Sequence, residues 1–365
     1  MRYETAMNHV SFQAIRSAST PELLRSARLE EQTRLYDRFT STKIEEWNRE
    51  AGELQDAVMS RAVNLCEEQF IEEGFGSPPA SYAFVAFGSA GREEQTLWSD
   101  QDNGLIIGTS EEPEGRTKTY FDQFGLRLSQ ILEEAGYPPC PGNVMVSNPL
   151  WRKTALEWEA QLETWREQLG WEQVRYLMIA ADLRHVSGDI SLSRKVRQSM
   201  HEIFEQTSSP EQNLAAAVLR NTVRHKAALN VLGQVITEQT GEHAGDFDVK
   251  YGLYLPIVNA VRYLAVEYGI NASSTQERLA QLNQLEVAPF RWLESCLQAF
   301  HTALRFRSMT SYIEESGMVS GTGYLPQAIL KQKEIRRELR EALGTVKLMY
   351  RTLQRQQRYA ERKWL

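Results

Sequence analysis

Cysteine is scarce in this sequence of 365 residues. Only three occur, Cys66, Cys140 and Cys296, and they are widely separated. This spacing offers neither a disulfide framework nor a zinc cluster, and it is typical of a reducing compartment, so we expect a cytoplasmic protein. Long apolar runs are also missing: no stretch approaches the length of a membrane span, and no apolar signal core follows the N-terminus. We therefore expect no membrane partner.

The sequence also lacks an excess of positive charge. The chain has 41 Lys and Arg against 48 Asp and Glu, a formal net charge of −7, which gives no global attraction to nucleic acid. A nucleic-acid partner is therefore not expected. The hydrophobic content of 42% and the charged content of 24% are ordinary for a globular protein. The length is sufficient for two or three domains with a substantial core.

The stretch from Tyr82 to Gly108 carries the strongest local pattern. Two short apolar runs, 82–87 and 105–107, are bounded by Gly or Asp, which predicts two neighbouring strands. The first run ends in a sharp turn at Gly88-Ser89. Such a turn supplies backbone N–H groups that a phosphate can approach closely, together with a hydroxyl.

Two aspartates precede the second run. Asp100 and Asp102 are two residues apart, and in an extended segment such residues point to the same side. Two carboxylates that face one point repel each other unless a cation lies between them, and Mg²⁺ with phosphate oxygens suits such a pair. Turn and aspartates together predict a site for a nucleotide and its metal ion.

These residues resemble a known signature. A strand that ends in Gly-Ser, followed after ten residues by Asp-x-Asp, is similar to the polymerase-β-like nucleotidyltransferase superfamily. The fuller string is more specific: Gly88-Ser89-x-Gly91-Arg92-x-Glu94 and then Ser99-Asp100-Gln101-Asp102-Asn103. It resembles a nucleotidyltransferase-like family of bacterial signalling proteins, related to the amino-terminal domain of the PII uridylyltransferase. The resemblance covers most of the chain from about Glu46 onward.

The resemblance implies a role for each matching residue. It implies that four residues bind the nucleotide: Gly88, Ser89, Gly91 and Arg92. It implies that three acids serve catalysis: Asp100, Asp102 and Glu94. The two aspartates would also hold Mg²⁺ or Mn²⁺, and Arg92 would neutralise the departing pyrophosphate. The substrate would be an NTP, the acceptor a hydroxyl of a small regulatory protein as in uridylyltransferases, and the helical regions would allow a homodimer.

One expected acid is missing. Enzymes of this superfamily usually carry a third carboxylate on a third strand, which we expect at 143–147, where the sequence Asn-Val-Met-Val-Ser has none. Glu93, Glu94 or Asp182 could take its place. Alternatively, Glu94 anchors its loop by accepting backbone N–H bonds. If no acid substitutes, the protein would be a catalytically weak nucleotide-binding sensor or an interaction module.

The overall pattern predicts an α+β fold. A small mixed sheet with strands near 82–87, 104–108 and 143–147 should precede a region that is helical throughout after about 154, including a helix over 210–239. With the resemblance, this gives four parts: an N-terminal helical segment, 1–40; a nucleotidyltransferase-like domain with its leading long helix, 41–153; a helical connection, 154–208; and a C-terminal helical domain that would bind the substrate, 209–365.

Three further features have plainer interpretations. Cys140 could be a nucleophile, but no His lies near it in sequence, and we favour a passive role. Asp246-Phe247-Asp248 repeats Asp-x-Asp without a Gly-Ser turn before it, which favours a structural turn over a second metal site. The last helix, expected over 326–362, carries an apolar seam with alternating spacings of four and three and a local excess of positive charge. We expect this seam to pack within its own bundle.

Overall fold

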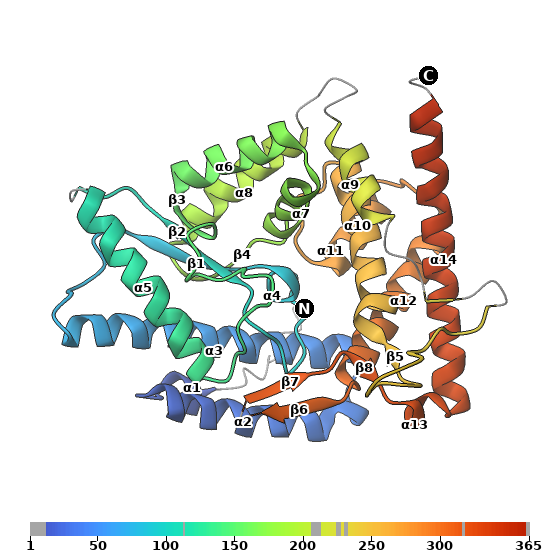
Figure 1. Ribbon diagram of the computed structural model, residues 1–365, viewed down its shortest axis with the longest axis horizontal. Coiled ribbons are helices and arrows are strands. Elements are labelled where there is room, and N and C mark those ends of the chain that lie inside the picture. The colour runs from blue at the N-terminus through green and yellow to red at the C-terminus, as the bar shows by residue number, and fades with distance from the viewer. Residues whose placement is uncertain are drawn as a thin grey trace, which may run out of the picture.

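The computed structural model describes residues 12–111, 114–205, 213–223, 228–229, 233–315 and 318–362. A small sheet lies between two groups of helices, and a bundle of further helices stands beside it (Figure 1). The expected α+β class is confirmed. No helix in these ranges is long and apolar enough to cross a membrane.

Helices open the described chain. They are α1 (Gln13–Arg16), α2 (Pro21–Arg38), the 3₁₀ turn η1 (Phe39–Ser41) and α3 (Ile44–Glu72). The Thr20 side chain accepts a hydrogen bond from the Leu23 N–H and so caps α2, whose first residue is a proline. The 29-residue helix α3 runs along the sheet and buries an apolar face that includes Val58, Ala62 and Leu65.

Four strands form the sheet, in the order β3-β2-β1-β4. Their bounds are β1 Tyr82–Ala86, β2 Asn103–Ile107, β3 Arg152–Thr154 and β4 Arg184–Gly188. β1 pairs antiparallel with β2 and with β4, whereas β2 and β3 are parallel. A single helical turn, α4 (Gly88–Gly91), follows β1. The sheet is therefore mixed, as predicted.

Alternate residues of the central strands fill two separate cores. Phe84 and Leu105 pack with α3 and with α5 (Glu114–Glu134), whereas Val85 and Ile106 belong to the core on the opposite face. That face is covered by α6 (Ala155–Gln168), α7 (Trp171–Ala180) and α8 (Ile190–Glu205). Figure 1 shows these two groups on opposite sides of the sheet. Both faces are covered, so all five residues of β1 are buried.

The C-terminal half is mainly a helical bundle. Its helices are α9 (Leu214–Thr222), the π-helical turn η3 (Lys250–Tyr254), α10 (Leu255–Glu267), α11 (Thr275–Gln284), α12 (Phe290–Ser308), α13 (Gln327–Leu330) and α14 (Lys333–Arg362). The apolar seam of α14 is buried against neighbouring helices of the bundle, as expected; it comprises Ile335, Leu339, Ala342, Val346, Met349 and Leu353. α14 stands at the outer edge of the molecule (Figure 1).

The predicted strand at 143–147 is wrong. These residues form a loop that ends in a turn, and Asn143 adopts φ +53° directly after Pro141-Gly142, which an extended strand does not allow. Val144 and Val146 are nevertheless buried, and the Asn103 N–H donates to the Val144 carbonyl at 3.1 Å. The alternating apolar pattern therefore reflects burial beside β2. On the side of β2 away from β1, the strand that pairs with it is β3, whose sequence Arg-Lys-Thr has no apolar residue.

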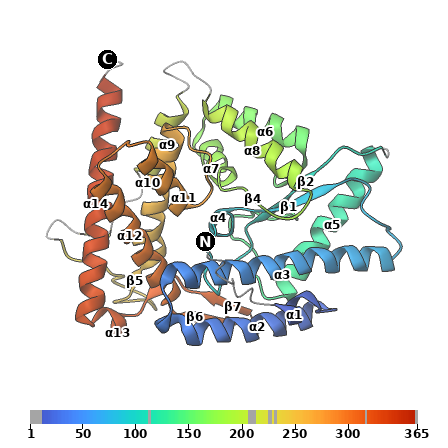
Figure 2. The same ribbon diagram turned by 180° about the vertical axis from the view of Figure 1, so that it is seen from behind.

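The expectation of helices alone after about 154 is also wrong. β4 completes the sheet, and two small ribbons follow: β5 (Phe247–Asp248) with β8 (Tyr324–Leu325), and β6 (Tyr312–Glu315) with β7 (Met318–Gly321). The β6–β7 hairpin lies beside α2 in the views from both sides (Figures 1 and 2). Of the helix expected over 210–239, the described residues form only α9, and Gly233 adopts φ +73° in a turn.

Candidate active site around the Gly-Ser turn

The predicted glycine-serine turn and Asp102 meet at one point. β1 ends at Ala86, and the next N–H, that of Phe87, donates to the Asp102 carbonyl at 2.9 Å. Gly88 then adopts φ +55°, and a Cβ atom built on it would lie 2.3 Å from Asp102 Oδ2. Only glycine combines this backbone conformation with such a close approach. The Gly88 backbone therefore packs directly against the Asp102 carboxylate.

Asp102 has an unusual electrostatic environment. Burial and the neighbouring negative charge of Asp100 raise the pKa of Asp102 to about 7, although a bond from Cys140 and the positive charges of Arg92 and Lys250 act in the opposite direction. Both aspartates are half-buried. The pair therefore concentrates negative charge at the surface beside the turn, and a bound cation would relieve it.

Cys140 is a neighbour of the aspartate pair that the sequence did not place there. Its Sγ lies 3.2 Å from Asp102 Oδ1 and donates to it. Burial and the charge of Asp102 raise the pKa of the Cys140 thiol to about 12. A thiol that stays protonated is a poor nucleophile. The geometry therefore supports a passive hydrogen-bonding role for Cys140.

The aspartate pair fits a divalent metal ion only in part. Within the described ranges, no three or more His, Cys, Asp or Glu side chains gather in a way that could hold a metal ion. Mg²⁺ typically takes one or two protein carboxylates and completes its octahedron with substrate phosphates and water. Asp100 and Asp102 supply that number of carboxylates. Their chemistry therefore suits an ion that arrives with a nucleotide better than a permanently bound one.

Glu94 is occupied by the second half of the chain. Its carboxylate accepts hydrogen bonds from the Tyr254 hydroxyl, from Arg92 Nε at 2.8 Å and from the Thr275 backbone N–H at 3.0 Å. The side chain is buried, and the Glu94 carbonyl accepts a further bond from Arg307 Nη1 at 3.0 Å. These contacts match the anchoring alternative, in which Glu94 holds its loop.

Arg92 does not point to open solvent either. Its guanidinium is buried and donates to Glu94, to Asp182 and to the Tyr254 hydroxyl oxygen. A side chain with these partners is not free to neutralise a departing pyrophosphate. Gly91 is buried too, and no side chain fits there, because a Cβ atom would lie 2.0 Å from the Asp182 carbonyl oxygen. Arg92 and Gly91 therefore support the loop on its buried side.

Asp182 is the centre of a buried ionic cluster. It is fully buried and forms ion pairs with Arg92, Arg262 and Arg278. Burial alone would raise the pKa of Asp182, but the three guanidinium groups outweigh it and hold the pKa below its usual value. Asp182 is therefore ionised and bound to arginines. Like Glu94, it is committed to holding the two halves of the chain together.

Side chains of α3 hold the loop that follows the Gly-Ser turn by hydrogen bonds to its carbonyls. The Asn48 and Gln55 side chains donate to the carbonyls of Gln95 and Thr96, each at 3.0 Å. Arg184 on β4 forms two bonds of 2.7 Å with Asp56 and donates to the Ala90 carbonyl at 3.0 Å. These bonds satisfy loop carbonyls that would otherwise be buried without partners.

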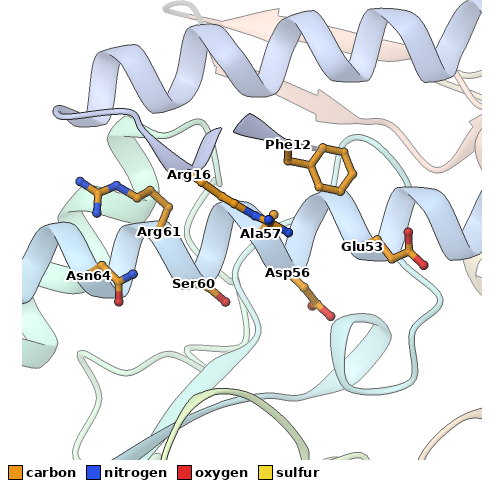
Figure 3. Close-up of a pocket in the computed structure, with 8 residues that line it drawn as sticks. All are labelled: Phe12, Arg16, Glu53, Asp56, Ala57, Ser60, Arg61 and Asn64. Carbon is orange, nitrogen blue, oxygen red and sulfur yellow. The ribbon is translucent and has the colours of Figure 1, made fainter. Parts of the chain in front are cut away.

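Asp56 also borders a cavity of about 550 Å³ between α1 and α3, where it points away from Phe12 (Figure 3). A second cavity, of about 700 Å³, lies near the far end of β2. Neither cavity is lined by Asp100 or Asp102. The aspartates and the Gly-Ser turn are therefore assigned from their chemistry and mutual contact.

Several residues of the site were missed from the sequence. Tyr254, Thr275 and Arg307 contact the loop from helices that begin more than 150 positions later, and no spacing pattern indicated them. Lys250 is exposed, and its charge acts on Asp102 from the second half of the chain. In the second Asp-x-Asp, Asp248 Oδ1 accepts the Tyr251 N–H at 2.8 Å, which supports the structural alternative.

Comparison with known protein families gives two matches. Residues 31–171 match the family described as "Putative nucleotidyltransferase DUF294", and residues 212–357 match the "Putative nucleotidyltransferase substrate binding domain". A search of curated proteins found no match. The first match contains the Gly-Ser turn and both aspartates, and the second contains Tyr254, Thr275 and Arg307. Together they cover most of the chain, which therefore belongs to the DUF294 nucleotidyltransferase-like family and carries its substrate-binding domain.

Proposed function

We propose that the protein is a metal-dependent nucleotidyltransferase that transfers a nucleoside monophosphate from an NTP to a hydroxyl group. The observation that carries this proposal is the contact between Gly88 and Asp102. Because the Asp102 carboxylate packs on the glycine, a phosphate held by the turn would lie beside the aspartate pair. The family matches support nucleotidyl transfer as the general reaction.

Each residue of the site would have a limited task. Asp100 and Asp102 would hold Mg²⁺ or Mn²⁺, which when bound neutralises the carboxylates and the triphosphate together. Backbone N–H groups at Gly88 and the Ser89 hydroxyl would orient the phosphates. Lys250 takes the place that we expected for Arg92, because its exposed ammonium acts on Asp102 and can meet negative charge on the departing pyrophosphate.

The acceptor would be bound by the C-terminal helices. The hydroxyl would give its proton to water as its oxygen attacks the α-phosphorus and forms a new phosphodiester bond. The bond from the α-phosphorus to the oxygen that bridges it to the β-phosphorus would break, and pyrophosphate would leave with that oxygen. We infer that this hydroxyl belongs to a regulatory protein, as the similarity to PII uridylyltransferases implies. The choice of NTP would be made by residues outside the Gly-Ser turn, because the proposed role of the turn is to bind phosphates alone.

A second candidate function is nucleotide sensing without transfer. Glu94 and Asp182, two of the acids that could replace the missing third carboxylate, are engaged by arginines. A site with only two acids binds a metal-nucleotide complex but activates a hydroxyl poorly. This observation favours a protein that reports bound nucleotide through the C-terminal helices.

One experiment separates the two functions. The full chain is incubated with each NTP labelled at the α-phosphate, with Mg²⁺ or Mn²⁺, and with candidate acceptor proteins of the PII type. A transferase attaches the label to the acceptor, and Asp100→Asn with Asp102→Asn stops it. A sensor binds one NTP in the presence of metal and attaches no label. Absence of both binding and transfer for all NTPs would contradict both functions.

A further inference from the structure

A cavity of about 700 Å³ opens at the carboxyl ends of the parallel strands β2 and β3. It is lined by the first turns of α5 and α6 and by α8, which lie beside these strands (Figure 1). Asp102 precedes β2, whereas Ile107 at its other end lines the cavity. The cavity is therefore separate from the candidate active site. Its volume is that of a site for a small organic molecule.

Part of the cavity is apolar. Ile107 and Phe121 line the cavity with buried side chains, and Leu192 adds a half-buried one. Leu156, on the first turn of α6, also lines the cavity, yet it remains 63% exposed. An exposed leucine at the mouth of a cavity is a surface that an apolar ligand can cover favourably, because burial removes apolar area from water.

The polar part of the cavity has an excess of positive charge. Four basic side chains line it, Lys118, Arg152, Lys153 and Lys195, against only two acids, Asp122 and Glu157. Asp122 is shared between two of these cations, since Lys118 Nζ lies 2.6 Å from one of its oxygens and Arg152 binds the other.

The other charges leave one cation free. Glu157 accepts the Thr154 N–H at 2.8 Å in the capping box of α6, and Lys195 pairs with Glu159 outside the cavity lining at 3.2 Å. In the part of the chain that the structure describes, Lys153 has no ion-pair partner. Lys153 is half-buried and lines the cavity, so its charge remains available to an anion beside the apolar wall.

We propose that this cavity binds a small organic anion in which a carboxylate, sulfonate or phosphate is joined to an apolar body. The anionic group would pair with Lys153, supported by the surplus charge around Arg152. The apolar body would lie on Leu156 and Leu192. This ligand is distinct from the nucleotide, because none of the residues that contact it belongs to the Gly-Ser turn or the aspartate pair.

Anilinonaphthalene sulfonate is a suitable probe, because it joins a sulfonate to an aromatic body and its fluorescence rises in apolar surroundings. The full chain should bind it, and Lys153→Glu and Leu156→Glu should each weaken binding by about tenfold. Lys153→Met keeps the length of the side chain and should weaken binding less. The neutral analogue N-phenylnaphthylamine should bind more weakly, with no response to Lys153→Glu.

Two matched substitutions control for general effects. Lys331→Glu reverses an exposed lysine elsewhere, and Leu285→Glu replaces a leucine on α11's end that is 56% exposed. Both should leave the probe affinity within about twofold of the parent. The proposal is wrong if the parent does not bind the probe, if the controls weaken binding as much as the cavity variants, or if Lys153→Glu and Lys153→Met both bind like the parent.

Discussion

Gly88 and Asp102 form the contact on which the candidate site depends. A side chain at position 88 would meet the Asp102 carboxylate, and the backbone there has a positive φ. Burial, together with the negative charge of Asp100, raises the pKa of Asp102, so the ionised pair is unfavourable without a cation. The two aspartates therefore suit a metal-nucleotide complex, but they lower the stability of the folded protein when no cation is bound.

Gly88→Ala tests the backbone contact. The new methyl group must move the Asp102 carboxylate, and φ +55° costs a non-glycine residue about 1–2 kcal/mol. We expect metal-dependent NTP binding to fall at least about tenfold, with a loss of about 1–2 kcal/mol in the free energy of unfolding. Gly52→Ala is the control, because nothing lies within 4 Å of its Cβ position in α3. Unchanged binding in Gly88→Ala would refute the contact.

Asp102→Asn tests the electrostatic strain. The folded pKa of about 7 lies above the ordinary value of 3.8, so ionisation of this carboxylate lowers stability as the pH rises from about 4 to 7, and the full cost is present above pH 7. With metal removed by chelator, the variant should be more stable than the parent by about 1–3 kcal/mol at pH 8, and by less at pH 5. Urea unfolding at both pH values measures this. Exposed Asp37→Asn should show no such difference, and an advantage of Asp102→Asn that grows toward pH 5 would contradict the assignment.

The loop between Ser89 and Asp100 is the element that joins the two halves of the protein. Side chains of α3 hold its carbonyls from one side, whereas Tyr254 and the α11 N-terminus hold Glu94 from the other. Trp98 from the same loop packs on Tyr312 of the β6–β7 hairpin, with ring centroids 5.3 Å apart. The position of the Gly-Ser turn therefore depends on the C-terminal domain.

Two substitutions of Glu94 separate anchoring from catalysis. Glu94→Gln keeps an oxygen that can accept from Thr275 N–H and Tyr254, so the transfer rate, or the NTP affinity of a sensor, should stay within about tenfold of the parent. Glu94→Ala removes all these bonds in a buried position and should lower the free energy of unfolding by about 3–5 kcal/mol. Thermal unfolding and transfer assays measure both quantities. A loss of about 10²-fold in rate for Glu94→Gln, with unchanged stability, would identify a catalytic acid instead.

Some parts of the fold and of the site could be predicted from the sequence and others could not, for physical reasons. The apolar runs of β1 and β2, the Gly-Ser turn and the Asp pair are encoded in adjacent residues, so local pattern was sufficient. β3 and β4 are polar edge strands whose pairing is decided by neighbours far along the chain. The roles of Arg92 and Asp182 depend on Arg262 and Arg278, which only the folded chain brings to them.

Lys250→Met tests whether the two domains share one site. The substitution removes an exposed positive charge that acts on Asp102 from η3. We expect NTP affinity in the presence of Mg²⁺ to fall by about tenfold at unchanged melting temperature, because the lysine makes no ion pair that supports the described fold. Lys331→Met is the matched control. If NTP affinity responds equally to both substitutions, Lys250 does not belong to the site.

Calorimetric titration of the full chain with each NTP, in the presence and absence of Mg²⁺, tests the central claim most directly. The parent should bind at least one NTP, and only with Mg²⁺ present. Asp100→Asn combined with Asp102→Asn should abolish this binding while the protein remains as stable as the parent or more so, because two mutually repelling carboxylates are gone. Equal NTP affinity in parent and double variant, or parent binding that does not depend on Mg²⁺, would contradict the assignment of a metal-nucleotide site to this aspartate pair.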